Sequence, residues 1–566
     1  MKSYDLLPIA LLSIASSLIA EVHVSDLFSD HMILQQEASN AIWGTAEPNE
    51  KITISASWGA QAETSANNAG KWKAFLSTPT YGTGHSLKIQ GDNIIDINNV
   101  AIGEVWLCAG QSNMGWSMGN SFEAEQEANV ILPNFRIFKS AREHWHEPLD
   151  EKRDRLDRWK TCNPESAAET SAVSYYFGKK LHLELDVPVG IIVQAFAGTP
   201  IEGWMPWDVQ KNNARSQLHK ADLDATAQRQ TEQMGMSAEQ AIAAYNQELV
   251  RYNAQIDAGE TMKNKVKSLA PPIITKPANL GHQYPAHQFN AMVNPIRPYG
   301  IRGAIWYQGE RNSKNVPQTL AYREQLALLI NYYRVSWNEL SDGNVAADFP
   351  FQFTQLPSWN PAQIEPVEGP EAVWSVNREM MRLTSLEVPH TAMAVSIDTG
   401  DAVALHPKNK KPIGLRHAYL ALKNTYNKDI IGSGPRYQSQ TSKDDTLTLH
   451  FDSCGSGLVA AKDEPLNSFA IAGKNETWHW ATATIKGDTI ELSSPNVPAP
   501  LAARYAWAMN PSQRNLLYNR EGIPASPFRT DNWPLFDPTA EIITVLKPSK
   551  DRSYQSKDWQ RPAMTQ

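Results

Sequence analysis

The stretch EVWLCAGQSNM, residues 104–114, sets an apolar run directly before a short polar turn that carries Ser112. Four later runs end in the same way, and they read VGIIVQAFAGTP, RGAIWYQGERN, FPFQFTQLPSW and TAMAVSIDTGD. Near-continuous apolar runs are typical of strands that are buried on both faces of a parallel sheet. Helical patterns at 173–185 and 319–337 alternate with these runs. The sequence therefore predicts an α/β domain over 103–428, with helices on both faces of a parallel sheet.

The segments on either side of this domain have the texture of antiparallel β-structure. Short β-like runs separated by turn residues fill 21–102, and similar runs return in 429–566. We expect an N-terminal β-sandwich over the first range and a β-rich domain, either a sandwich or a jelly roll, over the second.

The alternation of strands and helices breaks at about 210–285, which predicts an insertion. Apolar residues recur there at spacings of three and four, the period of an amphipathic helix. This stripe is expected to be a packing surface rather than a ligand site, and its members are Ile242, Tyr245, Leu249, Tyr252 and Ile256.

The first 20 residues have the order of a secretory signal peptide: a lysine, an apolar run and then small residues. A mature chain that begins between Ser16 and Glu21 would be secreted or periplasmic. A buried N-terminal helix or a membrane anchor is the alternative, but no later run is long enough to span a bilayer, so no membrane contact is expected of the mature form.

Composition excludes some partners and chemistries. The net charge of −8 over 566 residues gives no basic field for nucleic acid. Three cysteines allow at most one disulfide. Neither His282 nor His287 has acidic or cysteine neighbours at metal-ligand spacing, so we expect no metal and no cofactor. The oligomeric state stays open.

The polar loops after the apolar runs carry residues suited to acyl transfer. Ligand sites in α/β sheets lie outside the carboxyl ends of the strands. A serine between a strand and a helix can act as a nucleophile if a base is near, although Ser112 alone could equally be a helix cap. Gly198 can offer a backbone N–H and Asn312 a side-chain amide to an oxyanion, and His406 can act as the base. Met114 stands where an α/β-hydrolase elbow needs glycine, which disfavours that fold.

With these residues the chain resembles the sialate O-acetylesterase-like family of SGNH (GDSL-like) hydrolases, which are carbohydrate acetylesterases. The resemblance is carried by LFSDHMILQQ, IWGTAEPNEKI, IGEVWLCAGQSNM, AGTPIEGW, FNAMVNPI, GAIWYQGERN and DTGD with LHPKNKKPIGLR. It implies a catalytic domain flanked by β-domains and a secreted serine esterase that removes O-acetyl groups from a glycan.

The resemblance also implies the catalytic roles. Ser112 would be the nucleophile and His406 the general base, and the oxyanion hole would consist of the N–H groups of Ser112 and Gly198 with the amide of Asn312. Where the family usually has two glycines this chain has Ala197 and Gly198, so either N–H could face the oxyanion.

The acid of the catalytic triad departs from the family pattern. SGNH enzymes commonly place an aspartate two or three residues before the histidine, but Ala404 and Val403 occupy those positions. We predict that Asp398 orients His406, with Asp401 as second choice and a Ser–His dyad as third.

Substrate contacts are predicted for Gln111, Trp204, Gln308 and Glu310, and Glu310 is also expected to position its own loop. Trp204 is the first choice for stacking on a sugar among five tryptophans near the strand ends, the others being Trp116, Trp207, Trp306 and Trp359.

The expected substrate is an O-acetylated plant cell-wall polysaccharide such as xyloglucan or xylan. O-acetylated sialic acid is the alternative, and Arg311 could then bind its carboxylate. A catalytically inactive carbohydrate-binding protein is a further alternative, and a lipase or thioesterase is a fourth.

Overall fold

The computed structural model describes residues 21–152, 157–235, 237–257, 278–461, 465–511 and 516–539. The predicted signal peptide at 1–20 lies outside these ranges. No helix within them combines the length and the apolar character needed to cross a membrane.

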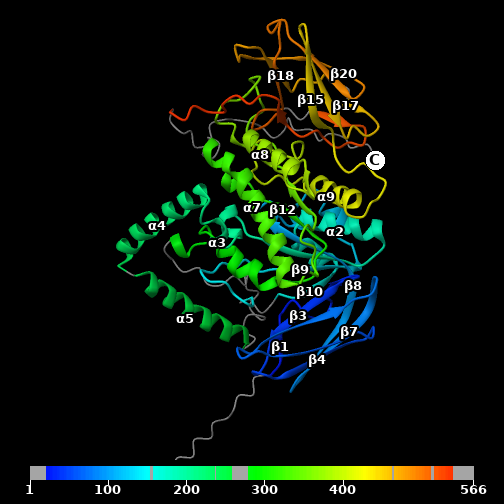
Figure 1. The fold of residues 1–566 in the computed structure, drawn as a ribbon, viewed down its shortest axis with the longest axis vertical. Helices are drawn as coiled ribbons and strands as arrows, with labels where there is room; N and C mark the ends of the chain where they lie inside the picture. The colour runs from blue at the N-terminus through cyan, green and yellow to red at the C-terminus, as the bar shows by residue number, and fades with distance from the viewer. Residues whose placement is uncertain are drawn as a thin grey trace, which may run out of the picture.

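Seven strands of an eleven-stranded sheet form the centre of the molecule (Figure 1). Its neighbours are parallel from β9 to β14, and only the edge strand β10 is antiparallel. The strands, in spatial order, are β10 (Trp159–Cys162), β9 (Leu132–Lys139), β11 (Val189–Ala195), β8 (Ile94–Gly110), β12 (Gly303–Tyr307), β13 (Phe351–Thr354) and β14 (Thr391–Ala394).

Helices cover both faces of this sheet, which confirms the predicted fold class. Alternate residues of β8 point to opposite cores: Leu107 packs in the core that includes α7 (Val316–Leu340), and Trp106 packs in the core of α2 (Ala172–Leu185) and α9 (Lys411–Asn424). Because neither face meets water, both alternating positions must be apolar. Further helices are α1 (Pro164–Glu169) and α8 (Val373–Glu387), and α8 packs on α7.

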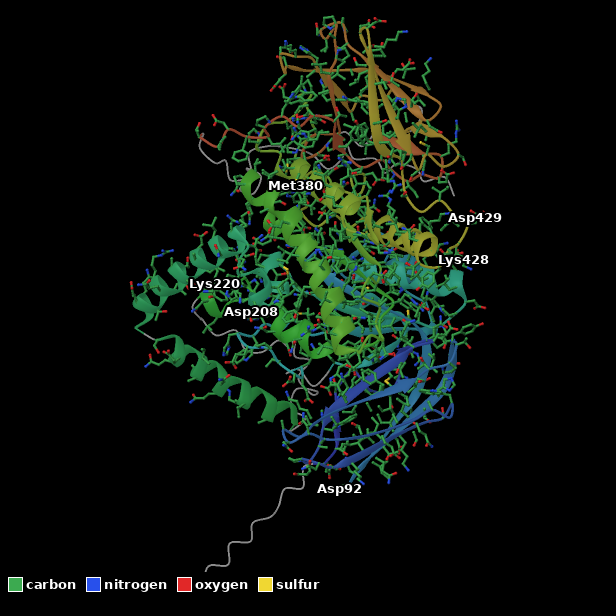
Figure 2. The ribbon with its side chains drawn as sticks, viewed as in Figure 1. Asp92, Asp208, Lys220, Met380, Lys428 and Asp429 are labelled. Atoms are coloured by element: carbon green, nitrogen blue, oxygen red, sulfur yellow. The ribbon has the colours of Figure 1, made fainter. Side chains whose placement is uncertain are left out.

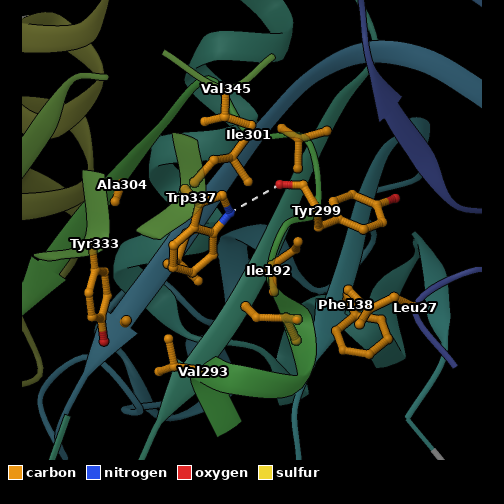
Figure 3. Packing of buried hydrophobic residues seen from close by; sticks show 14 of the residues in the cluster. Leu27, Phe138, Ile192, Val293, Tyr299, Ile301, Ala304, Tyr333, Trp337 and Val345 are labelled. Carbon is orange, nitrogen blue, oxygen red and sulfur yellow. Dashed lines mark hydrogen bonds between the residues drawn. The ribbon is translucent and has the colours of Figure 1, made fainter. Parts of the chain in front are cut away.

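The core between α7 and the sheet is filled by large side chains (Figure 3). Trp337 of α7 is fully buried, and its indole N–H donates to the Tyr299 carbonyl at 3.1 Å. Ile192 from β11 and Val293 belong to the same cluster. A buried indole needs such an acceptor, so this bond fixes α7 against the segment before β12.

The N-terminal β-domain shares a strand with the catalytic sheet. Residues 94–102 of β8 pair with β7, whereas residues 104–110 pair with β11 and β12. The domain boundary predicted at 102/103 therefore falls inside one continuous strand. The other strands are β1 (His23–Val24), β2 (Ile33–Gln35), β3 (Ser39–Thr45), β4 (Lys51–Ala56), β5 (Gln61–Ser65), β6 (Lys71–Ser77) and β7 (Gly82–Gln90).

The insertion is helical and lies to one side of the sheet, with α3 (Trp207–Gln210), α4 (Ala214–Met234) and α5 (Ala238–Asp257) (Figure 1). Asp208 and Lys220 mark this side in Figure 2. The apolar stripe predicted around Leu249 lies on α5, but the packing of most of its side chains is outside the described residues.

The C-terminal segment forms two four-stranded antiparallel sheets with a common core that includes Leu449, Ile471, Ile490 and Tyr505. Lys428 and Asp429, where the boundary was predicted, lie in the link that follows α9 (Figure 2). The strands are β15 (Arg436–Lys443), β16 (Thr446–Asp452), β21 (Thr489–Ser493) and β20 (Thr482–Lys486), then β19 (Trp478–Trp480), β18 (Phe469–Ala472), β22 (Ala502–Tyr505) and β24 (Phe528–Arg529), with β17 (Leu458–Ala460) and β23 (Leu517–Asn519) as a separate pair.

The three cysteines, Cys108, Cys162 and Cys454, are buried as free thiols. Burial raises the pKa of the Cys108 thiol to about 12. Because a thiol with so high a pKa stays protonated, Cys108 serves as a small apolar side chain in the core.

Candidate active site

Three neighbouring strands end at the same level and bring their loops together. Gly110 of β8 is in register with Ala195 of β11 and with Tyr307 of β12. A Cβ atom at Gly110 would lie 2.2 Å from the Tyr307 carbonyl oxygen, so only glycine allows the strands to approach this closely. Ser112, Gly198 and Asn312 follow these three strand ends within a few residues, at the carboxyl edge predicted for the site.

Ser112 and His406 meet at this edge. The Nε2 atom of His406 lies 2.8 Å from the Oγ atom of Ser112, although 294 residues separate them in the chain. The indole of Trp116 stacks on the imidazole, with ring centroids 5.7 Å apart and planes inclined by 20°. Burial and the positive charge of Lys410 hold the pKa of His406 below its usual value of 6.5. A neutral imidazole on a serine hydroxyl can accept its proton.

The structure contradicts the prediction that Asp398 orients His406. Both carboxylate oxygens of Asp398 accept hydrogen bonds from Arg416 of α9, at 2.6 and 2.7 Å, and Tyr518 donates to one of them at 3.2 Å. Because the Arg416 guanidinium forms two parallel hydrogen bonds to this carboxylate, it is a stronger partner than the imidazole of His406 would be.

The carboxylate of Asp401 binds the backbone of its own loop. Its Oδ1 atom accepts from the backbone N–H groups of Val403 and Ala404, both at 2.8 Å, which shapes the turn before His406. None of the ion pairs among the described residues includes His406. Ser112 and His406 therefore form a pair without a carboxylate, and the indole of Trp116 packs on the imidazole ring.

Replacing Asp398 by asparagine is therefore expected to affect stability and not the chemical step. The side chains of Asp398 and Arg416 are 11% and 6% exposed, and removing one charge from a buried pair costs about 3–5 kcal/mol. Urea unfolding should show this loss, while kcat per folded molecule stays nearly unchanged. Asp348→Asn, which breaks an exposed pair with His390, is the control and should cost at most about 1 kcal/mol. A fall of several orders of magnitude in kcat for Asp398→Asn would restore Asp398 as the triad acid.

Asn312 is fixed by three hydrogen bonds. Its Oδ1 atom accepts from the backbone N–H of Ile201 at 2.9 Å and from Gln308 at 2.7 Å, and its Nδ2 atom donates to Glu202 at 2.8 Å. An amide nitrogen carries two N–H groups, so one remains for a further acceptor. Glu202, which the sequence did not single out, thereby sets the orientation of Asn312.

Two of the predicted substrate contacts are buried in the core, and these predictions are wrong. Gln308 is fully buried and donates to Asn312 and to the Thr199 carbonyl. Trp204 is fully buried as well, and its indole donates to the Thr199 hydroxyl at 2.9 Å while its ring meets Trp306 edge-on. Of the other tryptophans, Trp306 and Trp359 are buried, and only Trp116 and Trp207 keep partial exposure.

Gln111 and Glu310, the other two predicted substrate contacts, bind each other. Gln111 is buried and donates to one carboxylate oxygen of Glu310, and Asn113 donates to the other at 2.5 Å. Glu310 thus contacts both neighbours of Ser112, in agreement with its predicted positioning role. Asn113 and Lys410, which bond to each other, lie within the stretches CAGQSNM and LHPKNKKPIG, but nothing in the sequence marks them as buried partners.

Comparison with known proteins shows which proteins this chain is similar to. Residues 102–256 match the family model described as "Carbohydrate esterase, sialic acid-specific acetylesterase". The chain is 24% identical over 533 residues to a sialate O-acetylesterase of Mus musculus, covering 88% of this chain and 92% of that protein. The human sialate O-acetylesterase shares 24% identity over 534 residues, with 88% and 91% covered.

A solved structure extends the match to the whole fold. A carbohydrate acetylesterase from Xanthomonas citri is 28% identical, with a TM-score of 0.73, and the alignment covers 90% of this chain and 100% of that one. The chain is thus similar, over most of its length, to the sialate O-acetylesterase-like family. As members of that family are carbohydrate esterases, the chain is a carboxylic ester hydrolase.

The match to the family model ends at residue 256, so it covers only part of the site. Its matched range contains Ser112 and Gly198, whereas Asn312 and His406 come from later loops. The fold brings these later loops to the same sheet edge, so the acetylesterase site is assembled from segments on both sides of the helical insertion.

Proposed function

We propose that this carbohydrate O-acetylesterase works through a Ser112–His406 dyad without a carboxylate partner. The observation that carries the proposal is the 2.8 Å contact between Ser112 Oγ and His406 Nε2 at the carboxyl edge of the sheet. The alternative of an inactive binding protein does not explain why a neutral imidazole is held on this hydroxyl.

The reaction proceeds in two acyl-transfer steps. His406 takes the proton of Ser112 as Oγ attacks the acetyl carbonyl, and returns it to the sugar oxygen as the C–O bond breaks. Water then attacks the acetyl-serine, with His406 again as base, and acetate leaves. The N–H groups of Ser112 and of Gly198 or Ala197, with the remaining N–H of Asn312, are the proposed donors to the oxyanion.

The first candidate substrate is an O-acetylated plant cell-wall polysaccharide such as xyloglucan or xylan. Its support is the absence of a basic surplus in the sequence and the higher identity, 28%, to a bacterial protein named only as a carbohydrate acetylesterase. We further propose that the chain is exported, on the order of charged, apolar and small residues at 1–20.

A cluster of cations beside Asn312 favours the second candidate, an O-acetylated sialic acid. Arg311 donates to the neutral amide of Gln283. Burial lowers the pKa of Lys314, and the charges of Arg311 and Arg215 lower it further, so the three cations lie within electrostatic reach of one another, while Glu202 opposes the charge of Arg311. Such a cluster suits the carboxylate of an acidic sugar, and the curated relatives are named as sialate O-acetylesterases.

Acetate release from a panel of acetylated xyloglucan, acetylated xylan and O-acetylated sialosides distinguishes the two candidates. If the first candidate is right, a polysaccharide is the better substrate, and Arg311→Gln and Lys314→Met leave its kcat/KM nearly unchanged. If sialosides are better, each variant should lower kcat/KM roughly 10- to 100-fold for sialosides alone, the range expected for a lost hydrogen bond to a charged group. Lys211→Met, on the exposed end of α3, is the matched control. Release from none of these substrates would contradict both candidates.

A further inference from the structure

Two ionisable side chains, Glu310 and Lys410, contact the turn that carries Ser112. Their partners in this turn are Gln111 and Asn113, which flank Ser112. Glu310 accepts from Gln111 on one side of the nucleophile and from Asn113 on the other. The Nζ atom of Lys410 donates to the Oδ1 atom of Asn113 at 2.5 Å. We refer to Gln111, Asn113, Glu310 and Lys410 as the clasp.

Asn113 connects its own turn to two other segments of the site. It donates to Glu310 in the loop after β12 and to the carbonyl of Leu405 at 3.3 Å, and it accepts from Lys410 at the start of α9. Leu405 directly precedes His406. A single amide therefore fixes the turn that carries the nucleophile relative to the loop that carries the base.

Lysine is an unfavourable residue at the position that Lys410 occupies in α9. It is the N-cap of α9, where serine, threonine, aspartate and asparagine are preferred and where the helix dipole disfavours a cation. Its side chain is fully buried instead of reaching solvent, with Nζ 5.4 Å from the centre of the Tyr307 ring. Burial lowers the pKa of Lys410 to about 7, although Glu310 opposes this shift. A placement that costs stability in three ways is expected where it serves the site.

We propose that Glu310 and Lys410 are positioning residues that hold Ser112 against His406 through Gln111 and Asn113. The proposal rests on the proposed Ser112–His406 dyad. The titratable groups around Lys410 are Glu310, His406 and Tyr307, and Tyr322 lies within the electrostatic reach of Glu310. Burial raises the pKa of the Glu310 carboxyl, and the hydrogen bond from Asn113 and the charge of Lys410 oppose this shift.

The two variants Lys410→Met and Glu310→Gln test the clasp. Methionine removes the cation at similar length, so the acid limb of kcat/KM should move upward by about one pH unit, since a neighbouring cation no longer opposes protonation of His406. Glutamine keeps the shape of Glu310 but offers only one acceptor oxygen for two donors. Both variants should lower kcat about 10- to 100-fold with little change in KM, because a displacement of about 1 Å at the reacting atoms has this effect.

Lys408→Met is the matched control, since Lys408 is exposed in the same loop. It should leave both kcat and the acid limb unchanged. Because both residues act on the same turn, the Lys410→Met/Glu310→Gln double variant should lower kcat little further than the slower single variant.

Thermal unfolding and labelling of Ser112 by a phosphonate are measured alongside. A folded Lys410→Met enzyme with the kcat of the wild type would overturn the proposal, and so would the failure of both variants to fold, because the clasp would then be a purely structural element. Failure of the dyad itself is recognised separately, since the wild type would then show no phosphonate label at Ser112.

Discussion

Replacing Ser112 by alanine is expected to abolish ester hydrolysis, with kcat on p-nitrophenyl acetate falling by at least about 10⁴-fold. The hydroxyl lies on a turn after β8, is partly exposed and makes its described side-chain contact with His406, so its loss removes the nucleophile and little packing. Circular dichroism and the unfolding temperature should match those of the wild type.

Ser117→Ala is the matched control on the same loop, where the serine hydroxyl accepts from Asn120 at 2.7 Å. It should keep nearly full activity. A serine-directed phosphonate should label the wild type at Ser112, as seen by peptide mass spectrometry, and should not label Ser112→Ala. Activity of Ser112→Ala close to that of the wild type would end the assignment of the nucleophile.

Removing the base should have an effect of the same size. His406→Ala is expected to lower kcat by about 10⁴-fold or more, and the Ser112→Ala/His406→Ala double variant should be no slower than either single variant, because the two residues act as one unit. His390→Ala, at an exposed histidine that pairs with Asp348, is the control and should leave kcat unchanged.

The pH dependence reports the surroundings of the same imidazole. His406 must be neutral to accept the serine proton, so wild-type kcat/KM should rise with pH and level off once the pKa of His406 is passed. Burial and Lys410 both disfavour the imidazolium, which places this pKa below 6.5. A carboxylate partner would raise this pKa instead, because an anion favours the imidazolium. An acid limb centred above 7 would indicate such a partner and would contradict the dyad.

The parts of the site that follow from local sequence pattern were predictable. Apolar runs that end in polar loops locate strand ends, and the carboxyl edge of a parallel sheet collects whatever those loops carry. Ser112 and His406 therefore came together as expected.

The parts that depend on competition between distant partners were not predictable. Nothing near Asp398 in the chain shows that Arg416, one helix later, takes both of its oxygens. Trp204 looked like an exposed ring at a strand end, but the turn after it buries the indole against Trp306. Lys410 reads as a surface lysine, since the sequence does not show that the start of α9 faces inward at that residue.

The shared strand β8 has a consequence for how the molecule unfolds. Its first half is hydrogen-bonded into the N-terminal β-domain, and its second half is the central strand that ends two residues before Ser112. A β-strand transmits displacement along its backbone, so loosening of the N-terminal sheet frees the register of the strand that carries the nucleophile. We therefore expect the two domains to unfold as a single cooperative unit, since cutting the chain at 102/103 would remove half of a strand rather than an independent module.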